Sequence, residues 1–355
     1  MELTSGALKH FAGKVVDWQK QHGRHALPWQ NTRDPYKVWL SEIMLQQTQV
    51  TTVLGYFDKF LKRFPSVAAL AEASIDEVLG LWSGLGYYSR ARNMHRCAQQ
   101  VVNMHAGTFP QSAAQLQTLP GIGPSTAAAI ASFCYSERVA ILDGNVRRVL
   151  TRVLAVQEDM SQKASETALQ LVANRLLPTH ELTDAMPRYT QGIMDLGATV
   201  CKRAKPACTI CPVQSMCVSH RDGNPEKYPV KTRKIKRSAQ SVWLLWGQNP
   251  TGEVWLTKRP SSGVWGELYC FPLFESKADV MAALATALHG QTRVLPPIKH
   301  VLTHKDLQLN VVVSKLDASK QLWQSNLDFA GGWVSPSKYA RLGLPAPIRA
   351  LLATA

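Results

Sequence analysis

The chain lacks the features of membrane and secreted proteins. No apolar run approaches the roughly 20 residues that a transmembrane helix needs, and the N-terminal stretch MELTSGALKHFAGKVV has no hydrophobic core followed by a cleavage site. The 7 cysteines are odd in number and four of them lie close together, which favours a reducing compartment and metal ligation over disulfide bonds. These absences predict a cytoplasmic protein with no membrane partner.

Acidic residues are also scarce. The 25 Asp and Glu residues stand against 40 Lys and Arg, which gives a formal net charge of +15. A soluble protein this basic most often meets a polyanion, so we expect a nucleic-acid-binding, nucleoid-associated protein. The 355 residues exceed one typical domain and fit two, and the sequence has no internal repeat or low-complexity tract.

The chain divides into three parts by pattern. Residues 1–225 carry apolar side chains at spacings of three and four, which is typical of amphipathic helices. Residues 226–237, EKYPVKTRKIKR, hold six basic residues and one acid, which indicates a linker that lies along phosphates. Residues 238–355 change to strand-like patterns. The fold class is therefore multi-domain, an all-α domain followed by an α+β domain.

The second domain has a readable order of elements. Residues 241–246 and 253–258 predict a β-hairpin around the turn QNPTG. Residues 278–290 predict one amphipathic helix, and residues 298–304 and 307–316 predict two more strands.

Four cysteines form the most specific motif. Cys201, Cys208, Cys211 and Cys217 have the spacing C-x6-C-x2-C-x5-C. Thiolate quartets hold Zn²⁺ or an iron–sulfur cluster. Zinc usually has two tight cysteine pairs, and only one exists here, so the loop 201–217 favours a [4Fe–4S] cluster, with structural zinc or unligated thiols as alternatives.

A glycine-rich turn joins two expected helices within residues 112–133. In LPGIGP, Gly121 and Gly123 flank one apolar residue, so the backbone can turn tightly and approach a ligand closely. The next helix opens with free N–H groups and the positive end of its dipole, which suits a phosphate. The pattern predicts a helix-hairpin-helix that grips a DNA backbone, and the alternative is an ordinary tight turn.

Two carboxylates are candidates for acid–base chemistry. Asp143 ends the apolar run VAILD and starts a helix, where backbone N–H groups would keep it ionised; the alternative is a helix cap alone. Glu42 lies among apolar residues in WLSEIML, which would raise its pKa and make it a proton donor; the alternative is a solvated polar face. A poised acid and an ionised carboxylate can together cleave a glycosidic bond.

Aromatic residues are available beside these motifs. Tyr87 and Tyr88 follow Gly86, and Trp29 precedes Glu42 in the sequence. Such rings can stack on bases or wedge between them. A buried position in the core is the commoner explanation for any one of them.

These motifs resemble a known family. LPGIGPST, ILDGNV and the cysteine spacing form the pattern of the endonuclease III superfamily of DNA glycosylases. WLSEIMLQQTQV resembles its adenine-specific branch, the MutY family, and Ser125 stands where lyase-competent relatives place a catalytic lysine. The second domain looks MutT-like (Nudix). The resemblance covers essentially the whole chain, more strongly over residues 25–220.

The resemblance implies a function. It implies a monofunctional enzyme of base excision repair that removes adenine mispaired with 8-oxoguanine, or with guanine, after flipping it from double-stranded DNA. Glu42 would protonate adenine N7 and later help to handle the incoming water. Asp143 would stabilise the cationic sugar or its covalent adduct, and Asn145 would help to fix the site. A single [4Fe–4S] cluster per chain would order a basic loop against DNA, and we expect a monomer.

The resemblance also implies DNA contacts. Gln47 and Tyr87 would wedge beside the oxidised guanine, and Trp29 and Gln191 would line the adenine pocket. The amides of the two hairpin glycines would hold a phosphate.

The C-terminal domain departs from its own superfamily. A Nudix hydrolase gathers Mg²⁺ with the acidic box G-x5-E-x7-R-E-x2-E-E-x-G, and none follows GVWGELYCFPLFE, so we expect no nucleotide hydrolysis. HVLTH resembles the lesion-sensing loop of the family, whose Phe-Ser-His appears here as Leu302-Thr303-His304. Thr303 keeps the hydroxyl group and His304 the imidazole. Leu302 puts a stacking contribution in doubt, and the alternative is a plain turn beside an edge strand.

Two rival functions fit part of the pattern. One is a bifunctional glycosylase/lyase or a thymine-mismatch glycosylase; the serine at position 125 argues against a lyase, because no amine stands there to form a Schiff base. The other is a catalytically silent DNA-binding module with a structural metal. Only the pair of Glu42 and Asp143 distinguishes that module from an enzyme.

Overall fold

The structure is a computed structural model that describes residues 10–232, 236–315, 322–323 and 330–354. The chain forms two compact units. Unit 1 comprises Met1–Ala71 and Arg96–Arg233, and unit 2 comprises Glu72–His95 and Lys234–Ala355. The predicted linker 226–237 spans the passage from one unit to the other, and its residues 233–235 lie outside the described part.

Unit 1 is helical, as the sequence predicts. Its helices are α2 (Phe11–His22), α3 (Pro35–Leu45), α4 (Val50–Arg63), α5 (Val67–Glu72), the second half of α7 (Ser89–His105), α8 (Ala113–Leu116), α9 (Pro124–Tyr135), α10 (Gly144–Val153), α11 (Lys163–Arg175), α12 (Leu182–Asp195) and α13 (Val218–Arg221), with a π-helix at Leu196–Val200 and 3-10 turns at Cys208–Ile210, Gln214–Met216 and Pro225–Lys227. In the described residues, no helix is long and apolar enough to cross a bilayer.

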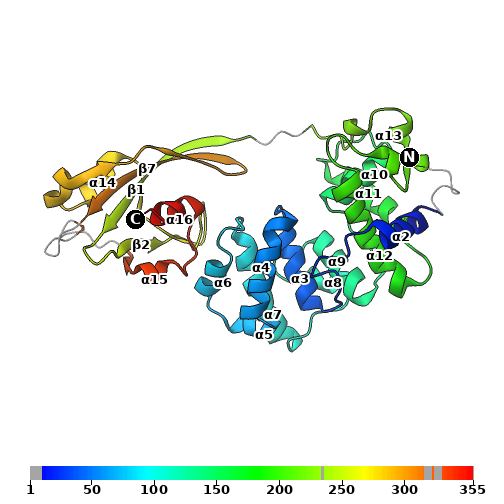
Figure 1. Ribbon diagram of the computed structural model, residues 1–355, viewed down its shortest axis with the longest axis horizontal. Coiled ribbons are helices and arrows are strands. Elements are labelled where there is room, and N and C mark those ends of the chain that lie inside the picture. Colours follow the sequence, from blue (N-terminus) through cyan, green and yellow to red (C-terminus); the bar gives the residue numbers. More distant parts are fainter. Residues whose placement is uncertain (1–9, 233–235, 316–321, 324–329, 355) are drawn as a thin grey trace. The chain divides into compact units, whose positions relative to one another are not determined.

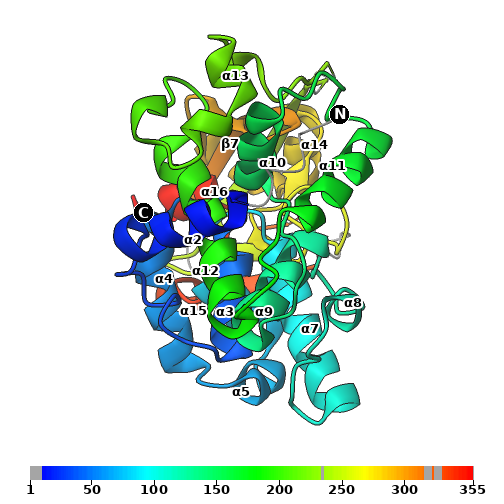
Figure 2. The same ribbon diagram turned by 90° about the vertical axis from the view of Figure 1, so that its right-hand side faces the viewer.

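The core of unit 1 joins segments that are far apart in the sequence. Helix α2 packs against α12, and the two lie side by side in Figure 2. Apolar side chains of α2, α9, α10, α11 and α12 form one buried cluster, which Val200 and Val213 of the cysteine region also join. Burying such side chains stabilises by about 1.5–3 kcal/mol each. The cysteine region is therefore part of the main core.

The predicted helix-hairpin-helix is present as α8, a tight turn and α9. Ser112 caps α8 by accepting a hydrogen bond from the Gln115 N–H at 3.3 Å. Gly121 has a φ of +77°, in the left-handed region that favours glycine, and Ile122 is buried beneath the turn. Gly123 is the N-cap of α9 and has an extended backbone, a conformation that any residue can adopt. Both glycines are exposed.

Unit 2 is built on a mixed sheet, which confirms the α+β prediction. Its strands are β1 (Ser238–Gln248), β2 (Val254–Lys258), β3 (Tyr269–Cys270), β4 (Leu273–Phe274), β5 (Thr292–Val294), β6 (Ile298–Val301), β7 (Lys305–Lys315) and β8 (Gly332–Val334), and its helices are α6 (Ile75–Leu81), α14 (Lys277–Ala283), α15 (Pro336–Tyr339) and α16 (Ala346–Leu352). The main path is β3-β2-β1-β7-β5. Strands β1 and β7 run parallel over their full length, side by side in Figure 1.

The predicted hairpin of β1 and β2 is confirmed by the antiparallel register Gln248↔Val254. The single helix predicted over 278–290 is wrong. Helix α14 ends at Ala283, Leu284 leaves it in an extended conformation, and a 3-10 turn follows from Thr286 to Gln291. Leu284 and Leu288 are both buried in a core with the sheet, so tertiary packing decides the break.

A segment from the middle of the chain belongs to unit 2. The Asp76 carboxylate accepts hydrogen bonds from Lys258 Nζ at 2.6 Å and from the Tyr269 hydroxyl at 2.9 Å. The Tyr88 hydroxyl donates to the Leu344 carbonyl at 2.9 Å. A Cβ at Gly80 would lie 1.9 Å from the Arg341 carbonyl oxygen, so only glycine permits this approach. Residues 72–95 therefore pack on the C-terminal sheet domain.

Candidate active site

One cavity in unit 1 gathers most of the predicted site. Its volume is about 1640 Å³. Every predicted catalytic and DNA-contacting residue of unit 1 lies on its wall, namely Trp29, Glu42, Gln47, Gly121, Gly123, Ser125, Asp143, Asn145 and Gln191. These residues come from five separate stretches of the chain, so folding creates the site and no single motif contains it.

Glu42 lies in the last turn of α3. Asp34 caps this helix by accepting from the Tyr36 N–H at 2.9 Å, and the buried Trp39 and Ile43 anchor it in the core. Glu42 is half-buried on the cavity wall. Burial first, and the charge of Asp143 second, raise the pKa of Glu42 to about 7. The burial and the raised pKa favour the proton-donor interpretation over a solvated polar face, because such a group can hold a proton near neutral pH.

Asp143 caps α10. Its carboxylate accepts from the Val146 N–H at 2.7 Å and from Asn145 Nδ2 at 3.3 Å. We expected such N–H groups to keep the carboxylate ionised, and they do lower its pKa. Burial outweighs them, so the pKa of Asp143 is raised overall. Arg148 acts with the N–H groups against that rise.

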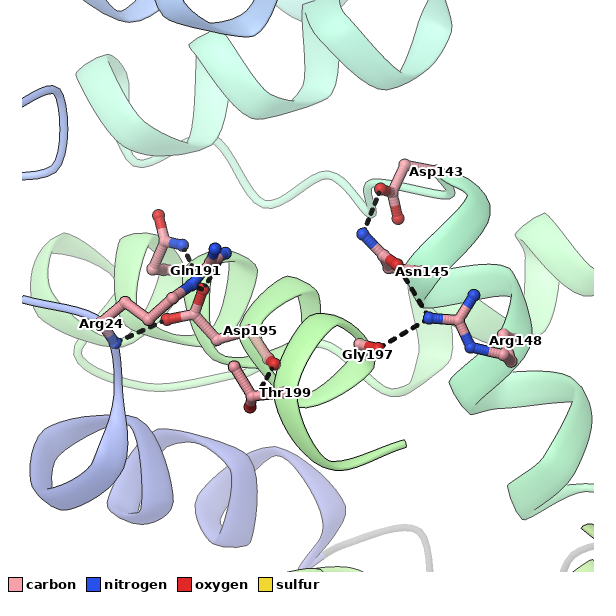
Figure 3. Close-up of polar contacts among 8 residues, drawn as sticks. All are labelled: Arg24, Asp143, Asn145, Arg148, Gln191, Asp195, Gly197 and Thr199. Carbon is pink, nitrogen blue, oxygen red and sulfur yellow. Dashed lines mark hydrogen bonds and ion pairs between the residues drawn. The ribbon is translucent and has the colours of Figure 1, made fainter. Parts of the chain in front are cut away.

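Asn145 links this carboxylate to the rest of the core. Its Nδ2 faces Asp143, and its Oδ1 accepts from Arg148 at 2.8 Å. Arg148 also donates to the carbonyl oxygens of Gly197 at 2.6 Å and Cys201 at 2.8 Å. Figure 3 shows the chain from Asp143 through Asn145 and Arg148 to Gly197. The start of α10 is thus fixed to the first cysteine of the loop.

All four cysteines of the loop line one small cavity. Arg152, which is 2% exposed, donates to Cys201 Sγ at 3.4 Å and to the carbonyl oxygens of Lys202 and Arg203 at 2.7 and 2.9 Å. Within the described residues, no three His, Cys, Asp or Glu side chains are arranged to hold a metal ion.

Another face of the main cavity carries amide and aromatic groups. Gln191 of α12 donates through Nε2 to the buried Asp195 at 2.9 Å, and Arg24 also binds Asp195 (Figure 3). Trp29 is buried and meets Phe57 edge-on, with 5.3 Å between ring centroids. Trp29 is thus a core residue that also forms part of the cavity wall, and its contact with a base stays a prediction.

The predicted wedge residues share an unusual backbone. Gln47 has a φ of +57° and Tyr87 a φ of +47°, a region that bulky residues rarely adopt and that costs on the order of 1–3 kcal/mol. Both side chains are exposed. Arg90 holds the loop before Tyr87, since it donates to the carbonyl oxygens of Leu85 and Gly86 at 3.1 and 3.3 Å.

Tyr87 and the predicted sensing loop lie together in unit 2. The Tyr87 and Thr303 hydroxyls are 3.0 Å apart, within hydrogen-bonding distance. Thr303 and His304 are exposed at the turn between β6 and β7. Leu302 packs instead against the core of the sheet, so the residue that replaces phenylalanine anchors the turn.

Sequence reasoning missed four of the residues that organise these sites. Arg148 and Arg152 are four residues apart on one face of α10, and this spacing was the signal that both reach a common partner. Arg24 and Asp195 are 171 residues apart, and no local pattern connects them.

The chain is similar to known DNA repair proteins. Residues 40–175 match the family of HhH-GPD superfamily base excision DNA repair proteins, and residues 242–354 match the NUDIX domain family. The adenine DNA glycosylase of Buchnera aphidicola subsp. Acyrthosiphon pisum is 35% identical over 344 residues, which are 96% of each chain. The human adenine DNA glycosylase is 42% identical over 216 residues, 58% of this chain and 39% of the relative.

Solved structures share the fold of the helical part. A thermostable thymine-DNA glycosylase matches with a TM-score of 0.56 and 25% identity, over 62% of this chain and all of that chain. A non-covalent endonuclease III–DNA complex matches with a TM-score of 0.52 at 17% identity, over 62% of this chain and 99% of that chain.

The raised pKa of Glu42 predicts a pH-dependent cost in stability. Folding disfavours the ionised form of Glu42, so wild-type stability falls as pH rises from the ordinary value of 4.5 towards about 7. A Glu42→Gln variant escapes this loss. Between pH 5 and pH 8 we expect it to gain about 2–3 kcal/mol of unfolding free energy relative to wild type, measured by urea unfolding.

The control is Asp58→Asn, because Asp58 is exposed on α4. The interpretation of Glu42 is wrong if both variants track the wild-type stability between these pH values.

Proposed function

Because the chain belongs to the adenine DNA glycosylase family of HhH-GPD base excision DNA repair proteins, we propose that it hydrolyses the N-glycosidic bond of adenine mispaired with 8-oxoguanine, or with guanine, in double-stranded DNA. The observation that supports the reaction is the placement of Glu42 and Asp143 on one cavity, where burial and the Asp143 charge raise the pKa of Glu42 to about 7. A silent binding module has no need for that arrangement.

The two carboxyl groups have opposite roles. Glu42 donates its proton to N7 of the departing adenine, which turns the base into a neutral leaving group. Asp143 remains the anion and stabilises the oxocarbenium-like sugar. The roles support one another, since the negative charge of Asp143 favours the protonated form of Glu42. After the base leaves, Glu42 is ionised and accepts a proton from the attacking water.

The surroundings fit a base that leaves the duplex. A cavity of about 1640 Å³ has room for a flipped nucleotide. Gly121 and Gly123 on its wall, at the opening of α9, offer backbone N–H groups to a phosphate. The net charge of +15 supplies a sequence-independent attraction to DNA. We infer that a single chain suffices, since all groups of the reaction come from one chain.

Ser125 supports monofunctional chemistry. It lies on the cavity wall in the first turn of α9. Its hydroxyl group cannot form the Schiff base through which a lyase cleaves the strand. Ser125 therefore leaves water as the nucleophile, and base loss ends at an intact abasic strand.

Adenine release tests the function directly. Under single-turnover conditions, duplexes with adenine opposite 8-oxoguanine or guanine should lose adenine, and a thymine:guanine duplex should not react. The abasic strand should break only after added alkali. Glu42→Gln should bind the duplex and release adenine roughly 10²-fold more slowly or worse, because one proton transfer is lost.

Asp58→Asn serves as the matched carboxylate control and should keep the wild-type rate. Full adenine release by Glu42→Gln refutes the role of the acid, and strand breakage without alkali refutes the monofunctional reaction.

The cysteine loop fits a [4Fe–4S] cluster, which we propose as the cofactor. The four thiols line one cavity, and their spacing, with only one tight cysteine pair, favours a cluster over zinc. The cluster would join the four cysteines of the loop to one another beside the core of unit 1. Arg152 would hold the loop around it through carbonyl and thiolate contacts, and Arg148 would carry its position to Asn145 and Asp143.

The cofactor is tested by absorption and metal content. The purified protein should absorb at about 400 nm and contain about four iron atoms per chain. Cys208→Ser should lose both signals, and Cys134→Ser, outside the loop, should keep them. A colourless protein with one zinc per chain would instead establish the zinc site.

We propose that Tyr87, Thr303 and His304 recognise the base opposite adenine. Tyr87 and Thr303 are already paired through their hydroxyls at 3.0 Å, and the strained backbone at Tyr87 presents its ring outward. Arg237 holds the turn by donating to the carbonyl oxygens of Leu302 and Thr303 at 2.8 and 3.3 Å. Gln47, whose backbone also has a positive φ, is the second wedge residue that we propose.

The hydroxyl of Thr303 can be tested by itself. Thr303→Val keeps the shape and removes the hydroxyl group, so the preference for 8-oxoguanine over guanine should fall by about 5-fold or more. Thr303→Ser keeps the hydroxyl group and should retain the preference. The measurement is the ratio of single-turnover rates for the two duplexes; equal ratios in both variants would remove Thr303 from recognition.

A further inference from the structure

Asp195 is a buried carboxylate that touches two residues of the cavity wall. It lies at the end of α12 and is 0% exposed. Its oxygens accept from the Arg24 backbone N–H at 2.9 Å, from Arg24 Nε at 2.7 Å and from Gln191 Nε2 at 2.9 Å. Arg24 completes an ion pair through a terminal nitrogen at 2.6 Å. Arg24 and Gln191 line the cavity, whereas Asp195 does not, and Figure 3 shows both side chains bound to the Asp195 carboxylate.

This carboxylate decides which end of the Gln191 amide faces the cavity. An ionised carboxylate only accepts hydrogen bonds, so the amide nitrogen must face Asp195. The amide oxygen then points the other way, as Figure 3 shows. Gln191 is thereby an acceptor toward the cavity and is held in that role.

Asp195 also controls Arg24. The guanidinium group of Arg24 contacts the Asp195 carboxylate through Nε and one terminal nitrogen. The negative charge of Asp195 therefore balances the positive charge of Arg24. Without Asp195, a cation with free N–H donors would face the cavity. The same change would free Gln191 to turn its NH₂ group inward. In both cases, hydrogen-bond donors would face the cavity where the wild-type protein presents the acceptor oxygen of Gln191.

We propose that Asp195 is a positioning residue that selects a 6-aminopurine over a 6-oxopurine, an inference that rests on the proposed function. The amine of adenine at C6 donates hydrogen bonds and matches the Gln191 oxygen. Hypoxanthine has the same ring system and an acceptor oxygen at C6, which the Gln191 oxygen repels. A polar site of this kind rejects a base that leaves its buried groups unpaired.

The experiment measures base preference as a ratio. Single-turnover rates are determined for duplexes that carry adenine or hypoxanthine opposite 8-oxoguanine, with wild type and Asp195→Asn. Because both enzymes meet the same two glycosidic bonds, the difference in intrinsic bond lability cancels between them. We expect the adenine/hypoxanthine rate ratio to fall roughly 10-fold or more in Asp195→Asn. Glu166→Gln, which removes a carboxylate that pairs with Arg147 on α10, should leave the ratio unchanged.

A second variant covers the case in which Asp195→Asn does not fold. Gln191→Met keeps the length of the side chain and the pair of Asp195 with Arg24, and it removes the amide group, that is, both the acceptor oxygen and the Nε2 donor to Asp195. Its adenine/hypoxanthine ratio should fall as well. An unchanged ratio in Gln191→Met, or equal slowing of both bases by Asp195→Asn, would show that Asp195 is merely structural and overturn the inference. Wild-type protein that releases no adenine would instead overturn the proposed function itself.

Discussion

The candidate site depends on how burial and hydrogen bonding act on two neighbouring carboxyl groups. Glu42 and Asp143 line the same cavity, and both pKa values are raised by burial. What separates them is hydrogen bonding. Asp143 accepts hydrogen bonds from N–H groups in the first turn of α10, and the positive charge of Arg148 lies nearby. Both effects lower the pKa of Asp143, against the effect of burial. Glu42 has no such opposing cause, and the Asp143 charge raises its pKa further. The helix cap therefore opposes the rise in pKa at Asp143 and gives the two carboxyl groups different environments.

That helix cap makes the cysteine region part of the active-site architecture. The cap works only while the first turn of α10 holds its place, and Arg148 ties that turn to the backbone of Gly197 and Cys201. Arg152, one turn later, is buried among the carbonyl oxygens of the loop. Arg152 is buried and Arg148 is half-buried, and a buried arginine is costly to desolvate unless its N–H groups find acceptors. The loop supplies those acceptors, so its shape and the position of Asp143 are maintained together.

The sequence could reveal the residues that follow from local rules. Glu42 among apolar neighbours, Asp143 as a cap and the left-handed Gly121 all depend on positions a few residues apart, and each was recognisable. Asp195 could not be, because an Asp near the end of a helix is ordinary until Arg24 is brought to it from 171 residues away. The net pKa direction of Asp143 was hidden for the same reason, since burial is a property of the whole core. The break after α14 likewise depends on contacts with the sheet that the helical pattern does not contain.

Tyr87 and the turn at Thr303 belong to the same compact unit, although they are far apart in the sequence. Tyr87 belongs by sequence to the helical half, yet residues 72–95 pack on the C-terminal sheet through Asp76, Gly80 and Tyr88. A wedge and a sensing loop on separate bodies would lose entropy each time both met one base. Here that cost is met once, during folding, because Tyr87 and Thr303 are already paired within one packed unit. The C-terminal domain, which lacks the acidic box of a Nudix hydrolase, thus contributes contacts that hold the tyrosine loop in place.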